Sequence, residues 1–389
     1  MKRYISLTFI IVCLCSCSSK YAHIVDDSFN YDLPPEELVK ELGSLPVSTI
    51  IPDRVKTIRM AFHFFNNEEG SINYKEDTGP EVVSILLDVA NKRMKSNDKM
   101  MLPVGNDIPV YDSKIRYKLA RAEEGPAIFY HYDKSPPYFF KKSKNSNIYD
   151  RDVVTKYAYR PDSILNVLVL PFDPEFLQNG KEKAELTGVA LGTTIKLPGL
   201  FQSGKPVWDY AGTFNHEVGH VLGLRHAWNK YDQCNDTPIH DNCWTKTTHP
   251  PCNHPTSNNL MDYNAHQSAM TPCQIEKMHA TLANQNHRAR GLVIEDICLK
   301  QAGILEISEW TKWIQPFVID KDVVIMKGGL LFLGEDVRLA SDVSIKVEKG
   351  GTLVLKRTTI GGSCGPWVGI YKHPKGRIFD LSNAPLLKY

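Results

Sequence analysis

The sequence predicts an α/β (α+β) domain followed by a small all-β domain. Between residues 51 and 292, runs rich in branched and aromatic residues alternate with helix-like segments. One of those segments, near 209–222, carries a group of histidines. After residue 293, short β runs alternate with Gly-rich breaks, which is typical of an all-β unit. Mixed strands with interspersed helices favour a twisted mixed sheet in the first domain.

The individual elements follow from local patterns. The segment 80–94 has apolar residues near a 3.6-residue period, and the helix expected at 271–284 has Pro272 in its first turn. Residues 18–50 are polar and Pro-punctuated, with one short helix expected at 34–42, and are interpreted as a tether or short pro-segment. Strands are expected at 55–65, 114–122, 127–132, 164–172 and 188–197.

The C-terminal region, 293–389, contains an internal repeat. The phrases VIMKGGLLFL and IKVEKGGTLVL recur with their glycine pairs, at Gly328 and Gly350, 22 residues apart. A strand–turn–strand repeat of this period predicts β-helix-like coils, about three of them. A small β-sandwich is the alternative. In either form we interpret the region as an appendage and not as a second enzyme.

Composition bounds the function. The chain has 389 residues, of which 42% are hydrophobic and 23% charged, so a sizeable core is expected. The formal net charge is only +2, and no polybasic region is present, which argues against nucleic-acid binding. The sequence has neither a GxSxG elbow nor a phosphate-binding glycine loop, so serine-hydrolase and nucleotide chemistry lack support.

Residues 1–17 have the pattern of a targeting segment. Lys2 and Arg3 precede an apolar run, Tyr4 to Leu14, that is too short to span a membrane. The run ends in LCSCSSK, which resembles a bacterial lipobox with Cys17 as the lipidated residue. We therefore expect an exported lipoprotein, held at the outer membrane or cell surface through a lipid anchor only. A plain secretory signal is the alternative.

Export changes how the cysteines are interpreted. Outside the signal region six cysteines remain, an even set that allows up to three disulfides in an oxidising compartment. Four of the six lie within 234–273, and we expect disulfides among them. The sequence does not show which cysteine pairs with which. No CxxC pair is present, so a cysteine zinc site is disfavoured. The six candidates are Cys234, Cys243, Cys252, Cys273, Cys298 and Cys364.

Residues 216–226 read HEVGHVLGLRH and predict a metal centre. His216 and His220 are four residues apart, so they share one face of a helix. Gly223 can adopt a left-handed conformation and end that helix, which lets His226 approach the same ion from another direction. Three neutral imidazoles with one open position are the donor set expected of catalytic Zn²⁺.

Glu217 is one step round the helix from His216, beside the metal without being a ligand. Zinc lowers the pKa of its bound water from about 15.7 to about 7 and polarises a carbonyl group. Glu217 would take the proton of that water and deliver it to the leaving amine. The motif therefore predicts a catalytic zinc site with Glu217 as general base.

A second motif, NLMDY at 259–263, follows and resembles the Met-turn of the metzincin metalloproteases. The resemblance implies a metzincin fold, with a mixed twisted sheet behind the active-site helix. It implies that Met261 forms an apolar floor beneath the three histidines. It also implies that Tyr263 lies near the metal, where its hydroxyl can stabilise an oxyanion.

The stretch from GTFNHEVGHVLGLRHAW through CNDTP, NLMDY and TPCQIEKMH resembles the pappalysin family, also called cytophagalysin or ulilysin-like metalloproteases. The resemblance extends over 51–292, which we expect to be the protease domain. It also implies Ca²⁺ sites to which loop carboxylates contribute, although solvated carboxylates are the simpler reading. The carboxylates are Asp232, Asp236, Asp241 and Asp262, and the loop histidines for which we expect no special role are His240, His249, His254 and His266.

These observations predict a zinc endopeptidase that hydrolyses peptide bonds in proteins. The strand at 188–197 is expected at the sheet edge, where extended substrate can add as a further strand. Latency through an aspartate of the N-terminal segment, such as Asp26, Asp27 or Asp32, is a further hypothesis. The alternative function is a noncatalytic surface-binding lipoprotein with a structural metal site and a β-rich tail that binds glycan or protein.

Overall fold

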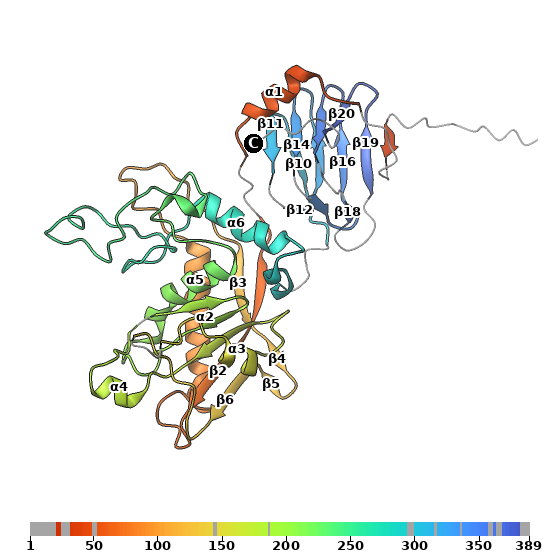
Figure 1. Ribbon diagram of the computed structural model, residues 1–389. Helices are drawn as coiled ribbons and strands as arrows, with labels where there is room; N and C mark the ends of the chain where they lie inside the picture. The colour runs from red at the N-terminus through yellow and green to blue at the C-terminus, as the bar shows by residue number, and fades with distance from the viewer. Residues whose placement is uncertain are drawn as a thin grey trace, which may run out of the picture.

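The chain folds into an α/β unit and an all-β unit (Figure 1). The predicted fold class is confirmed. The structure is a computed structural model. It describes residues 21–24, 32–48, 53–142, 146–185, 187–293, 299–314, 317–334, 337–356, 361–362 and 368–381.

The α/β unit is built on a mixed sheet of order β3-β2-β7-β9-β8, with β6 also paired to β2. Every pairing in it is parallel except that of β8 with β9. The central strand β2 reads KTIRMAFHFFN, a near-continuous apolar run that suits a strand covered on both faces. The strands are β2 (Lys56–Asn66), β3 (Ile115–Leu119), β6 (Ile128–Tyr132), β7 (Leu165–Val169), β8 (Val189–Leu191) and β9 (Thr194–Lys196), with a small hairpin of β4 (Arg121–Ala122) and β5 (Gly125–Pro126).

Side chains alternate along β2 between two cores. Met60, Phe62 and Phe64 pack with α2 (Gly79–Ser96) and α5 (Tyr210–Val221) on one face. Phe65 points to the other face and joins a separate cluster. The remaining helices are α3 (Asp152–Tyr157), α4 (Pro174–Gln178) and α6 (Pro272–Ala283), with 3₁₀ turns at Val207–Asp209, Lys230–Asp232 and Arg288–Leu292.

The segment 188–197 differs from the prediction. It forms two short antiparallel strands, β8 and β9, instead of one strand. Gly192 lies between them with a φ of 75°, a left-handed conformation that a glycine adopts without Cβ strain. The turn makes β8 the last strand of the sheet, directly beside α5, so that it borders the helix with the histidine motif.

The all-β unit consists of stacked parallel coils. Equivalent strands pair 22 residues apart in the middle of the stack, for example Val323 with Ile345 and Leu330 with Thr352. This register matches the repeat predicted from the glycine pairs, and the parallel pairing is that of a β-helix and not of an antiparallel β-sandwich. The three sheets comprise β10 (Ile304–Ile307), β13 (Asp322–Ile325), β16 (Ser344–Val347) and β19 (Gly369–Lys372); β11 (Trp310–Trp313), β14 (Leu330–Leu333), β17 (Thr352–Leu355) and β20 (Arg377–Asp380); and β12 (Phe317–Ile319), β15 (Val337–Leu339) and β18 (Gly361–Gly362).

The repeated glycine pairs have a steric cause. The first glycine of each pair has a positive φ, 85° at Gly328 and 79° at Gly350. The second has no room for a side chain: a Cβ on Gly329 would lie 2.1 Å from the Ile307 carbonyl oxygen. A Cβ on Gly351 would lie 2.5 Å from the Ile325 carbonyl oxygen. Each coil therefore turns at a point where the backbone of the preceding coil leaves no room for a side chain.

The N-terminal segment packs against the all-β unit. β1 (Ala22–Ile24) pairs antiparallel with β19, at the end of that sheet. α1 (Glu36–Ser44) buries Leu42 against a cluster that includes Phe332. The Lys312 ammonium donates to the carbonyl oxygens of Leu42 and Leu45, at 3.0 and 3.1 Å. The part of residues 18–50 that the structure describes is therefore integrated into the C-terminal fold.

Asp32 also lies in this all-β unit, where its carbonyl accepts from Asp380 N–H at 3.2 Å. It does not reach the histidines, so Asp32 is wrong as a candidate for a latency aspartate. Asp26 and Asp27 lie outside the described residues. Among the residues that the structure does describe, no helix is long and apolar enough to cross a membrane.

Candidate active site

The three histidines of the motif come together at one point. His216 and His220 are one turn apart on α5, which ends at Val221 with Leu222 as its C-cap. Gly223 follows with a φ of 86°, and a Cβ there would also lie 2.5 Å from the Thr281 hydroxyl oxygen. This glycine reverses the chain, so that His226 returns to the helix. His220 Nε2 lies 3.1 Å from both His216 Nε2 and His226 Nε2.

Hydrogen bonds fix two of the imidazole rings. His216 Nδ1 lies 2.7 Å from the carbonyl oxygen of Leu260, and His220 Nδ1 lies 2.9 Å from that of Leu224. A carbonyl oxygen can only accept, so each Nδ1 carries the proton. The Nε2 atoms of these two rings therefore direct lone pairs toward the point where the three rings meet.

The electrostatics of this donor set fit a divalent cation. Burial, with the neighbouring His220 second, lowers the pKa of His216 to about 3 and that of His226 to about 4. Burial also lowers the pKa of His220. The rings are thus neutral at pH 7, and the lone pairs of His216 and His220 are available to a metal ion. Two nitrogens bound tetrahedrally at about 2.05 Å from zinc are about 3.3 Å apart, close to the observed spacing.

Glu217 lies beside the histidines and is only 5% exposed. Burial raises its pKa to about 8, while a hydrogen bond from the backbone N–H of Ala190 opposes the shift. The Glu217 side chain also packs against Gly188, the residue before β8, because a Cβ on Gly188 would lie 2.5 Å from Glu217 Cγ. The edge strand therefore fixes the position of this carboxyl.

The Met-turn packs under α5. Met261 is fully buried, and a Cβ on Gly219 would lie 2.5 Å from its sulfur. The turn is held by Asn259, whose Oδ1 accepts from Met261 N–H at 2.8 Å. The side-chain amides of Asn259 and of Gln274 in α6 form two reciprocal hydrogen bonds, at 2.9 and 3.0 Å. Gly219, Asn259 and Gln274 were not expected at this site from the sequence.

Tyr263 lies next to the histidines. Its ring centroid is 4.7 Å from that of His226 and 5.8 Å from that of His216, and the side chain is 47% exposed. Burial first, and then the charge of Glu217, raise the pKa of its hydroxyl. The phenol therefore keeps its proton at neutral pH and can act as a hydrogen-bond donor.

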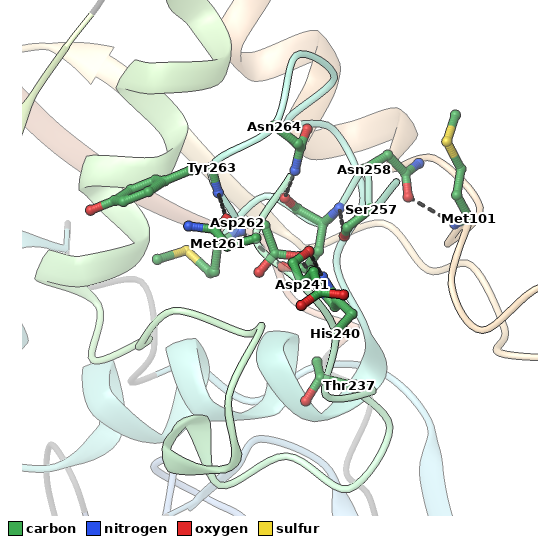
Figure 2. Close-up of polar contacts among 12 residues, drawn as sticks. Met101, Thr237, His240, Asp241, Ser257, Asn258, Met261, Asp262, Tyr263 and Asn264 are labelled. Atoms are coloured by element: carbon green, nitrogen blue, oxygen red, sulfur yellow. Dashed lines mark hydrogen bonds and ion pairs between the residues drawn. The ribbon is translucent and has the colours of Figure 1, made fainter. Parts of the chain in front are cut away.

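His240 has a partner that the sequence did not predict. Its Nε2 lies 2.9 Å from Asp262 Oδ2, and its Nδ1 lies 2.8 Å from the carbonyl oxygen of Asp241 (Figure 2). Asp262 follows Met261 directly and is 1% exposed. This pair joins the loop after the histidine motif to the Met-turn. His240 thus has a structural contact with the Met-turn.

Two disulfides fasten the same loop, Cys234–Cys273 and Cys243–Cys252, with Cα–Cα distances of 5.7 and 5.6 Å. The expected pairing among the four clustered cysteines is confirmed. Cys298 and Cys364, like Cys17, lie outside the described residues. A Cys–Asp–Cys group of Cys234, Asp236 and Cys273 has metal-like spacing, but its sulfurs are bonded to each other.

Protein groups contact the carboxylates considered for Ca²⁺. Asp232 accepts from the Thr237 hydroxyl and from Cys234 N–H, and Asp236 accepts from Cys273 N–H at 3.0 Å. The Lys277 ammonium contacts the Asp232 carbonyl oxygen. These contacts anchor the loop to the start of α6.

Comparisons with known proteins found one family match and several similar solved structures. Residues 202–283 match the model of the peptidase M43 family, described as "Pregnancy-associated plasma protein-A". Mature mirolysin of Tannerella forsythia in complex with a cleaved peptide is 18% identical, with a TM-score of 0.44, over 62% of this chain and 97% of that chain. A promirolysin mutant from the same organism is also 18% identical, with a TM-score of 0.44, over 66% and 88%. No curated protein matches the chain.

The matched region contains the whole histidine motif and the Met-turn. The matched family consists of metalloendopeptidases, enzymes whose metal is typically zinc. Within that class, the family match confirms the resemblance to the pappalysin-type metzincins over residues 202–283.

Proposed function

We propose that this chain is an exported zinc endopeptidase in which His216, His220 and His226 hold the metal and Glu217 is the general base. The observation that carries the proposal is the convergence of the three Nε2 atoms beside a buried carboxyl. A structural zinc site is closed by four protein ligands, whereas this one has three nitrogen donors and an adjacent carboxyl. That arrangement favours catalysis over a purely structural metal.

Zinc, when bound, polarises the scissile carbonyl and acidifies a water molecule. Glu217 accepts the proton of the attacking water and transfers it to the nitrogen of the leaving amine. Burial supports this role, because it brings the pKa of Glu217 to about 8, near the working pH of a general acid–base group. The carboxyl lies next to the N–H of Ala190, which keeps it oriented.

Tyr263 is placed to stabilise charge in the transition state. Its hydroxyl retains its proton, and its ring lies against His226 and His216. As the carbonyl oxygen of the substrate becomes negative, the phenol donates a hydrogen bond to it. The half-exposed position leaves the ring accessible to a substrate that enters from solvent.

The edge strand β8 supplies a surface for the substrate backbone. β8 is the last strand of its sheet and pairs with β9 on one side. An extended peptide that adds to the other side of β8 runs past Glu217, because Gly188 and Ala190 both contact that residue. We infer that peptides bind there in extended form and that side-chain preference comes from the surrounding loops.

Cleavage of casein tests the proposed function. We expect the protein to cut denatured casein at internal bonds, seen by mass spectrometry as new pairs of peptides, and 1,10-phenanthroline to stop the reaction. Added Zn²⁺ should restore it. Intact casein after incubation with zinc-loaded protein would instead support the noncatalytic binding function.

Cys17 is proposed as the site of a lipid anchor, on the basis of the LCSCSSK sequence that follows the apolar run. Metabolic labelling with a fatty acid should mark the full chain, and Cys17→Ser should lose the label. Equal labelling of the variant would refute this acylation site.

A further inference from the structure

The third histidine of the site is held differently from the other two. His216 and His220 lie on α5, and each ring bonds to a backbone carbonyl oxygen through Nδ1. His226 lies in the loop beyond Gly223, and within the described part of the chain its Nδ1 has no hydrogen bond. A metal-binding histidine is usually oriented by a hydrogen bond at its second nitrogen. His226 therefore needs another source of orientation.

The ring of His226 is stacked on that of Trp228. The two ring centroids are 4.2 Å apart and the planes are 18° from parallel. Tyr263 packs edge-on against the same imidazole at 4.7 Å, and its ring centroid lies 4.8 Å from that of Trp228. The three rings thus contact one another, so that a rotation of His226 would break contacts with both neighbours.

The backbone around Trp228 is itself fixed. The N–H of Ala227 donates to the Met261 carbonyl oxygen at 3.3 Å, and the N–H of His240 donates to the Trp228 carbonyl oxygen at 3.2 Å. The first bond ties the backbone beside Trp228 to the Met-turn, and the second ties the Trp228 backbone to the loop that the His240–Asp262 pair secures. Because the backbone on both sides of it is held, the half-buried indole offers the imidazole a rigid surface.

We propose that Trp228 is a positioning residue of the active site: its ring sets the plane of His226 in place of the missing hydrogen bond and holds Tyr263 beside it. This inference rests on the proposed function. The ring contacts of Trp228 are with His226 and Tyr263. Trp228 acts through the metal ligand and through the phenol.

Zinc affinity measures this role directly. The metal-free protein is titrated with Zn²⁺ in competition with a chromophoric chelator, and Trp228→Ala is expected to bind about 10- to 100-fold more weakly, the usual effect of removing a group that orients a ligand. Trp228→Phe keeps an aromatic face and is expected to recover most of the affinity. Trp244→Ala is the matched control, since Trp244 is 56% exposed in the neighbouring loop, and its affinity should equal that of the wild type.

Fluorescence gives a second readout that does not depend on activity. Binding of Zn²⁺ to the metal-free protein should change the tryptophan emission of the wild type and of Trp244→Phe, and this change should be absent in Trp228→Phe. If Trp228→Ala is unstable, the emission response of Trp228→Phe to Zn²⁺ still decides the question.

The outcomes separate this inference from the proposed function. Equal zinc affinity in the wild type and Trp228→Ala, or an unchanged emission response in Trp228→Phe, overturns the role of Trp228 alone. If the wild type fails to bind one zinc ion per chain, the proposed function fails as well.

Discussion

Glu217→Gln is expected to reduce kcat/KM for a fluorogenic peptide by about 10²- to 10⁴-fold, the usual contribution of a general acid–base group. Glutamine has nearly the same shape as glutamate, and it fills the space beside Gly188 and the Ala190 N–H. Its amide cannot take a proton from the attacking water. The loss should therefore appear in kcat, with the three histidines undisturbed.

Two measurements control this variant. Its zinc content should equal that of the wild type, since the proposed ligands are the three histidines. The metal-free variant should also be more stable at pH 7: burial raises the pKa of Glu217 from 4.5 to about 8, so folding takes up a proton between these values. The free energy of unfolding of the wild type therefore falls by about 3 kcal/mol between pH 4.5 and pH 7. Glutamine does not titrate, so the variant avoids this loss. Unchanged kcat would show that another group moves the proton.

Gly188→Ala is expected to lower kcat/KM by about 10²-fold without removing a catalytic group. The new methyl group would lie 2.5 Å from Glu217 Cγ and 2.9 Å from the carboxyl carbon, too close for either atom to stay in place. The carboxyl must then move, and a displacement of about 1 Å at a catalytic group has an effect of this size. Peptide hydrolysis at saturating zinc measures the effect.

Gly43→Ala provides the matched control, because the same methyl group at Gly43 of α1 meets nothing within 4 Å. That variant should retain wild-type activity. Zinc binding should be unaffected by either substitution. Full activity in Gly188→Ala would mean that the carboxyl adapts to the crowding and that β8 does not position it.

The convergence of the three histidines was predictable because its geometry is local. Positions four apart on a helix share a face, and Gly223 permits the reversal that brings back His226. The start of α6 was also predictable, since Thr271, Pro272 and Gln274 form a capping box with proline in the first turn. In both cases the interacting residues lie within eleven positions of one another.

The rest of the site depends on contacts between distant parts of the chain. Asn259 is hydrogen-bonded to Gln274, and His240 to Asp262. The spacing of these residues in the sequence does not indicate either contact. Gly188 and Gly219 read as ordinary glycines until Glu217 and Met261 are placed against them. Stacking of Trp228 on His226 joins residues only two apart, yet it follows from the loop conformation and not from a helical or strand period.

The same reason applies to larger features. The segment GVALGTTIKL has the composition of one strand, and only the left-handed Gly192 divides it into a hairpin. The N-terminal helix was expected at 34–42, but it runs from Glu36 to Ser44 and is held by Lys312, 270 residues after Leu42. A sequence pattern shows that such a helix has an apolar face but does not show which partner covers it.

The packing of β1 and α1 against the C-terminal coils makes the protease unit an insertion within another fold. The chain leaves the coil stack after α1 and returns to it at β10, so two covalent links join the units. A protease that nicked only the first link would leave α1 and β1 attached to the stack by their buried contacts. Shedding of the catalytic unit from its N-terminus therefore requires both links to be severed.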